Sequence, residues 1–153
     1  MLPIKKILCP TDFSEAAYKA LAAAKELAIK FDAELWIVHG VEPIKALTAP
    51  ANFPLSVYYQ ERMKAAEKQM AAVVEERISD HRRVKVRVEM SAPADAVIRV
   101  AEAEALDLIV IATHGESAFH HLLFGSVAEK VIRQAPCPIL VIRAQDKKTD
   151  QSP

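Results

Sequence analysis

Two of the chain's three glycines frame a segment that could hold a phosphate. Gly115 and Gly125 are separated by nine residues, and Ser126 follows the second glycine directly. An apolar run at residues 106–111 precedes the segment, and apolar side chains recur at helical spacing in residues 126–135 after it. In an open parallel α/β sheet such a loop lies at the carboxyl end of a strand, where glycine lets a ligand approach the backbone and the helix N–H groups attract an anion. The segment therefore predicts a phosphate-binding loop.

Asp12 is a second candidate for ligand contact. It follows the short apolar run at residues 4–9, whose strand ends at Pro10. A carboxylate at a strand end could accept hydrogen bonds from a ribose or an amide, or hold a cation. However, Asp12 and Ser14 are both favoured N-caps, so either could instead begin the helix predicted over residues 14–31.

The start of the last helix has the same two interpretations. Ser126 and Glu129 have the spacing of a capping box, which alone would explain both residues. The hydroxyl and backbone amide of Ser126, with the amide of Val127, could equally surround a phosphate. The two roles are compatible.

Two other kinds of chemistry are disfavoured. The loop holds a cluster of possible metal ligands, namely His114, Glu116, His120 and His121. Adjacent histidines do not easily share one helical face, and loop histidines are commonly solvated, so we expect no metal centre beyond Mg²⁺ held by Asp12 through a nucleotide. A hydrolase triad of Ser126, His114 and Asp12 would lack the Gly-x-Ser-x-Gly elbow.

Strands and helices alternate along the whole chain. Strands are predicted at residues 4–9, 35–38, 84–90, 106–111 and 139–142, and helices at 14–31, 57–78, 93–105 and 126–135. This order predicts a single-domain, Rossmann-like α/β fold with an open five-stranded parallel sheet and helices on both faces. The strand at 84–90 alternates apolar and charged side chains, which places it at a sheet edge.

Composition restricts the classes of partner. The chain has 153 residues, 52% of them hydrophobic, which suits one domain. Twenty basic and twenty acidic residues balance, which argues against nucleic acid or an anionic membrane as partner. Apolar runs stay far below the ~18 residues of a membrane span, and no secretory leader pattern is present, so a cytoplasmic protein is expected. We expect Cys9 and Cys137 to be reduced packing residues.

The glycine segment resembles the nucleotide-binding signature of the universal stress protein family. That signature is Gly-x-x-Gly, nine residues and Gly-Ser, matched here by Ala112-Thr113-His114-Gly115 and Gly125-Ser126. Further likeness lies in residues 7–14 and 135–143, so the resemblance spans roughly 3–143. It implies strand order 3-2-1-4-5 and a family domain over residues 1–145. From its polar composition we expect the tail at 146–153 to be disordered.

The resemblance also implies an adenine-nucleotide site of ten residues. Those near the adenosine are Pro10, Thr11, Asp12 and Gly40; those beside the ribose are Ile111 and Ala112; those at the phosphates are Gly115, Gly125, Ser126 and Val127. Ala112 replaces the signature's first glycine, and we expect it to have an ordinary dihedral. Gly40 stands where a relative uses Val against adenine, so that wall of the site is expected to be thinner.

The sequence thus predicts a universal stress protein that binds ATP, ADP or AMP, with Mg²⁺, and acts as a dimeric regulator or sensor with an unidentified protein partner. The dimer would form through residues 139–142, which are apolar on both faces at a sheet edge. One alternative is a nucleotide-free dimeric interaction protein. The other is a slow ATP hydrolase; no lysine or arginine lies between residues 112 and 126, and no P-loop is present, so fast phosphoryl transfer is not expected.

Overall fold

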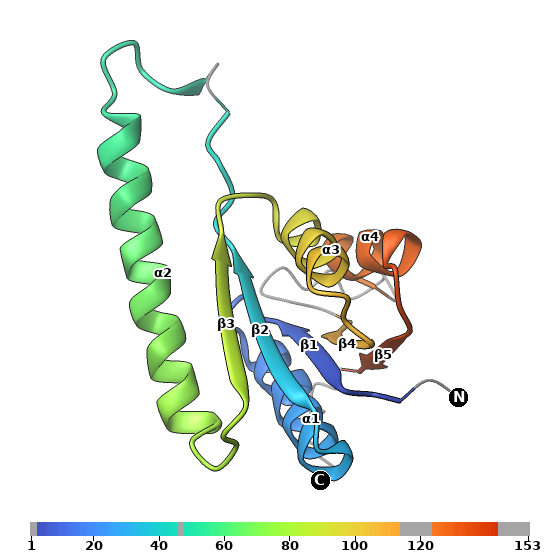
Figure 1. The fold of residues 1–153 in the computed structure, drawn as a ribbon. Helices are drawn as coiled ribbons and strands as arrows, with labels where there is room; N and C mark the ends of the chain where they lie inside the picture. The colour runs from blue at the N-terminus through green and yellow to red at the C-terminus, as the bar shows by residue number, and fades with distance from the viewer. Residues whose placement is uncertain (1–2, 46–47, 114–123, 144–153) are drawn as a thin grey trace, which may run out of the picture.

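The computed structural model describes residues 3–45, 48–113 and 124–143. The predicted strands and helices are all present in this part of the chain (Figure 1). In chain order they are β1 (Lys6–Pro10), α1 (Glu15–Phe31), β2 (Glu34–Gly40), α2 (Leu55–Arg77), β3 (Val84–Glu89), α3 (Pro93–Ala103), β4 (Leu108–Ala112), α4 (Ser126–Gln134) and β5 (Ile139–Ile142).

The strands form one parallel sheet in the order β3-β2-β1-β4-β5. β1 is the central strand, with Ile7 opposite Leu35 of β2 on one side and Leu108 of β4 on the other. The predicted strand order is therefore confirmed, including a switch point between β1 and β4. The cavity of a doubly wound sheet is expected at the carboxyl ends of these two strands.

Alternate strand residues divide the core into two layers. Ile7, Cys9, Leu35 and Ile37 pack under α1 and α2, whereas Leu8, Trp36, Val38 and Ile109 pack under α3 and α4. This is the alternation that a strand covered on both faces requires, and it confirms helices on both sides of the sheet. Cys9 and Cys137 form no disulfide, and burial raises the pKa of the Cys9 thiol far above its usual range.

α2 is packed along only part of its length. Ala66, Met70 and Val73 are buried, whereas Tyr59 and Met63, which share their helical stripe, stay half-exposed. Figure 1 shows why: the C-terminal half of α2 lies beside β3, while its N-terminal half extends past the carboxyl end of that strand. Only the second half of this stripe therefore belongs to the core.

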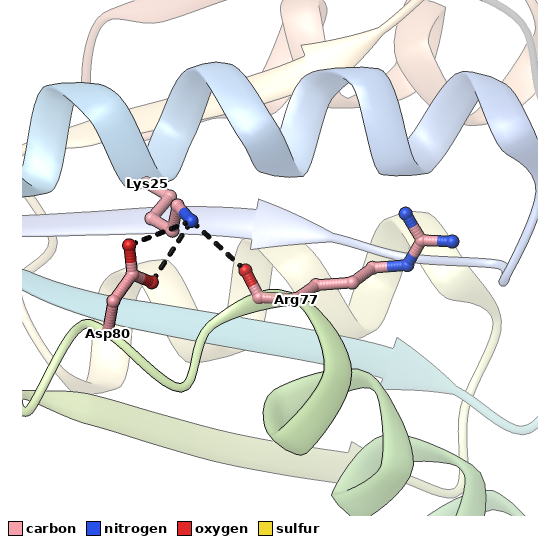
Figure 2. A network of polar contacts seen from close by, with 3 residues as sticks. All are labelled: Lys25, Arg77 and Asp80. Carbon is pink, nitrogen blue, oxygen red and sulfur yellow. Dashed lines mark hydrogen bonds and ion pairs between the residues drawn. The ribbon is translucent and has the colours of Figure 1, made fainter.

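The C-terminal end of α2 is fixed to α1 by polar contacts (Figure 2). The Lys25 ammonium donates hydrogen bonds to the Asp80 carboxylate at 3.0 Å and to the Arg77 carbonyl at 3.2 Å. The Arg77 guanidinium lies over the Tyr18 ring, 3.6 Å from its centroid. The Lys25 hydrogen bond lowers the pKa of Asp80. Because the folded value is the lower one, the stabilisation from this pair is present above the ordinary carboxyl range and is lost as pH falls.

β3 is an edge strand, as its alternating pattern predicts. Val84 and Val88 pack against the layer under α1 and α2, but Val86 between them is 41% exposed. The opposite face carries Arg87, whose guanidinium pairs with Glu104 at 2.9 Å. In the described part of the chain, no helix is both long and apolar enough to cross a membrane.

The uneven packing of α2 gives a direct test. We expect Met70→Ala, which empties a fully buried site, to lower the free energy of unfolding by about 2–5 kcal/mol. Val57→Ala, on the projecting half where Val57 is 49% exposed, is expected to change it by less than about 0.5 kcal/mol. Urea denaturation of both variants measures the difference. Equal losses of unfolding free energy would contradict the packing of α2 along its C-terminal half alone.

Candidate functional site

A cavity of about 330 Å³ opens at the carboxyl ends of β1, β2 and β4. Nine of the ten residues predicted for the site line it: Pro10, Thr11, Asp12, Gly40, Ile111, Ala112, Gly125, Ser126 and Val127. The tenth, Gly115, lies outside the described residues. Segments more than 100 positions apart in the sequence are thus brought to one place by the pairing of β1 with β4.

The turn after β1 is held by its own side chains. The Thr11 amide donates to the Val38 carbonyl at 2.9 Å, and the Thr11 hydroxyl accepts from the Phe13 amide at 3.0 Å. Asp12 accepts from the Ser14 amide at 3.0 Å, while the Ser14 hydroxyl accepts from the Ala17 amide at 3.2 Å. Ser14 is therefore the N-cap of α1, and Asp12 is placed at the cavity by a turn that precedes the helix.

Phe13 adopts a strained conformation within this turn. Its φ is 64°, in the left-handed region, which costs a bulky residue on the order of 1–3 kcal/mol. The ring of His39 lies 4.6 Å from the Phe13 ring, centroid to centroid, and His39 Nδ1 is 2.8 Å from the Thr11 carbonyl oxygen. A carbonyl only accepts, so Nδ1 carries the hydrogen. These contacts hold the strained residue in place.

The end of β2 lies unusually close to the turn before α3. A Cβ atom on Gly40 would be 2.8 Å from both the Pro93 Cα and the Ser91 carbonyl oxygen, closer than packed atoms come. Pro93 also lines the cavity. The expectation of a thinner wall at Gly40 was therefore wrong, because the Ser91 to Pro93 backbone fills the space that a side chain would take.

Ala112 ends β4 in an ordinary backbone conformation. It pairs with Ile142 of β5 and is not among the described residues with positive φ, which confirms the expected unstrained dihedral. Thr113 follows, 4% exposed, and its carbonyl accepts from the Gly125 amide at 2.6 Å. This bond joins the two ends of the glycine segment, so the cavity has a fixed rim on this side.

The N-terminus of α4 has no side-chain cap. Gly125 is the N-cap, with φ −69° and ψ 165°, and no side-chain cap hydrogen bond is made. Ser126 is the first helical residue, and Glu129 instead pairs with Arg133 at 2.8 Å. The capping-box interpretation of Ser126 and Glu129 was therefore wrong. The first residues of α4 line the cavity, so the amides at the helix N-terminus and the positive end of the helix dipole lie beside it.

Among the described residues of the lining, only Asp12 has a charged side chain. Most of the remaining surface is apolar or backbone, which suits a neutral ring system at one end and an anion at the amides of α4. In the described residues no group of three or more His, Cys, Asp or Glu side chains could hold a metal ion. The histidine cluster, including the His114 that the considered triad would need, lies outside them.

Six lining residues were not predicted from the sequence: Ala17, Val38, His39, Pro93, Thr113 and Ala128. His39 and Thr113 directly adjoin predicted residues at strand ends, so the positions of the strands could have indicated both. Pro93 lies 53 positions after Gly40, and only the pairing of β2 with β3 brings the two together.

The fold and cavity define a Rossmann-like α/β protein with a ligand-sized site at its switch point. The chain matches the universal stress protein family over residues 3–143, and it belongs to that family. Universal stress protein MJ0531 of Methanocaldococcus jannaschii is 36% identical over 149 residues, covering 94% of this chain and 85% of that protein.

Solved structures agree with the fold. That of MJ0577 from M. jannaschii has a TM-score of 0.81 and 27% identity, covering 95% of this chain and 99% of that one. A universal stress protein in complex with cAMP has a TM-score of 0.62 at 22% identity, over 94% and 100% of the two chains. One from Archaeoglobus fulgidus in complex with dAMP has 0.58 at 21%, over 93% and 99%.

The close approach at Gly40 predicts that even alanine is not tolerated there. We expect Gly40→Ala to destabilise the fold by about 1–3 kcal/mol, because two backbone segments must separate. Ser91→Ala is the control: among the described residues the Ser91 hydroxyl is buried without a partner, so its removal is expected to be neutral. Thermal unfolding that is unchanged in Gly40→Ala would contradict the packing described.

Proposed function

We propose that this protein is a dimeric regulator or sensor of the stress response that binds an adenine nucleotide, ATP foremost. The observation that carries the proposal is the cavity itself: the turn of Thr11 and Asp12 lies across from the uncapped first turn of α4. A carboxylate suits ribose hydroxyls, and helix amides suit phosphates. The cAMP and dAMP complexes of proteins with this fold support an adenine nucleotide as the ligand class.

The expected arrangement follows from the chemistry of the lining. The base would lie at the apolar end formed by Val38, Gly40 and Pro93, where backbone groups of β2 offer hydrogen bonds. The phosphates would lie at Gly125 and Ser126, and Mg²⁺ would be held by the phosphates together with Asp12. We place the protein in the cytoplasm, where its unpaired cysteines stay reduced.

A charge substitution at the phosphate end tests the proposal. We expect wild-type protein to bind ATP with a Kd between about 1 µM and 1 mM, and Gly125→Asp to weaken binding at least about 100-fold, because a carboxylate then occupies the place of a phosphate. Gly125→Asn is the matched control, since Asn and Asp are equally good N-caps and differ in charge. It is expected to lose less than about tenfold.

Calorimetry with Mg·ATP measures these affinities, and mass spectrometry of small molecules released from the denatured protein identifies a copurified ligand. No binding by the wild type at millimolar ATP, with no nucleotide released, would contradict the proposal and favour the nucleotide-free interaction protein. Equal losses in Gly125→Asp and Gly125→Asn would contradict the assignment of the phosphate end.

The dimer is proposed to form through β5. This strand ends the sheet, all four of its residues are apolar, and Leu140 is 39% exposed. An apolar edge strand pairs readily with a second copy, which closes the assembly by a two-fold axis.

A lysine on this strand is expected to disrupt the dimer. Leu140→Lys should give monomers at micromolar concentration in sedimentation velocity, because the charge would have to be buried on assembly. Val86→Lys is the control, since Val86 has nearly the same exposure, 41%, on the opposite edge strand β3. It is expected to remain dimeric. Monomeric wild-type protein, or dissociation by Val86→Lys alone, would contradict the proposed interface.

A further inference from the structure

His39 contacts the turn after β1 in two ways. Its Nδ1 donates a hydrogen bond to the Thr11 carbonyl at 2.8 Å, and its ring lies against Phe13 at 4.6 Å between centroids. Both contacts are made from the carboxyl end of β2, one residue before Gly40. The side chain therefore joins the second strand to the turn that carries Thr11 and Asp12.

The turn needs such support because its conformation is unfavourable for its sequence. Phe13 has a φ of 64°, which a bulky residue rarely adopts without tertiary contacts. The Phe13 amide donates to the Thr11 hydroxyl and the Ser14 amide donates to Asp12, each at 3.0 Å. If Phe13 returned to negative φ, the Ser14–Asp12 hydrogen bond, which spans that torsion, would break and the Asp12 side chain at the cavity would move.

We propose that His39 is a positioning residue for the ligand. By binding the Thr11 carbonyl and covering the Phe13 ring, it holds the turn in the left-handed conformation that presents Thr11 and Asp12 to the cavity. The proposal rests on the proposed function, because the ligand that these residues meet is the adenine nucleotide. Of the lining residues that the structure describes, His39 alone combines a donor to this turn with a ring against Phe13.

Two substitutions separate the hydrogen bond from the bulk of the ring. In His39→Asn the amide nitrogen can donate from about the place of Nδ1, and ATP affinity is expected to stay within about threefold of wild type. His39→Leu removes the donor and is expected to weaken ATP binding about tenfold, the loss of one buried hydrogen bond. Equal affinities of His39→Leu and wild type would overturn the proposal.

His81 provides a matched control. Its Nε2 lies 3.1 Å from the Ala33 carbonyl oxygen, so it too joins a turn to β2, but at the strand's other end, away from the cavity. His81→Leu is expected to lower the unfolding temperature about as much as His39→Leu while leaving ATP affinity within about twofold of wild type. Equal weakening of ATP binding by both variants would mean that general destabilisation is the cause.

A second variant tests the route through Phe13. Glycine adopts positive φ without strain, so in Phe13→Gly the turn no longer depends on the His39 hydrogen bond to stay left-handed. The effect of His39→Leu on ATP affinity is expected to fall from about tenfold to less than about threefold in this background. If His39→Leu still weakens ATP binding about tenfold in the Phe13→Gly background, the two substitutions act independently and the proposed mechanism is wrong.

Amide hydrogen exchange in the nucleotide-free protein keeps this proposal separate from the proposed function. We expect His39→Leu to speed exchange of the Phe13 and Ser14 amides about tenfold, with no change in His81→Leu. If the wild type binds no ATP but exchange responds in this way, the proposed function fails and the positioning role of His39 stands. If ATP binds and exchange at these amides is unchanged, the positioning proposal fails alone.

Discussion

The parallel pairing of β1 with both β2 and β4 is the constraint on which the rest of the molecule depends. Ile7, Leu8 and Cys9 of β1 are fully buried, and the strand takes a neighbour on each side. The chain leaves β1 toward α1 on one face and leaves β4 toward α4 on the other, so the two turns diverge at the same edge of the sheet. The cavity is the gap between them, and its opposite walls come from different layers of the fold.

Much of this arrangement could be predicted, because the buried strands are unbroken apolar runs and the helices between them have clear periodicity. The packing of α2 shows the limit of periodicity. It tells which side chains share a face but not how far the sheet extends beneath them. At 23 residues α2 is roughly 35 Å long, whereas the six residues of β3 reach roughly 20 Å. The first half of the helix therefore has no strand to cover.

Sequence motifs predicted the site residues that lie in short local segments. They missed the features that depend on contacts between distant segments. Ser126 and Glu129 fit a capping box in the sequence, yet the helix begins one position earlier than the box requires, with Gly125 as the N-cap. The role of Gly40 depends on the Ser91 to Pro93 backbone, and the left-handed Phe13 lies against the His39 ring. No spacing in the sequence indicates either approach, because the partners are 26 or more positions apart along the chain.

The balance of charge at the cavity bears on what the proposed nucleotide would do there. The amides of α4 and the helix dipole supply about half a positive charge, which suits a bound phosphate. Cleavage is more demanding, because the transferring phosphoryl group needs cationic side chains or metal ions around its oxygens. Among the described residues of the lining Asp12 is the only charged side chain, and no lysine or arginine occurs between residues 112 and 126. The proposed Mg²⁺ would therefore be the main cation at the phosphoryl oxygens, and we expect the proposed nucleotide to be retained rather than hydrolysed rapidly.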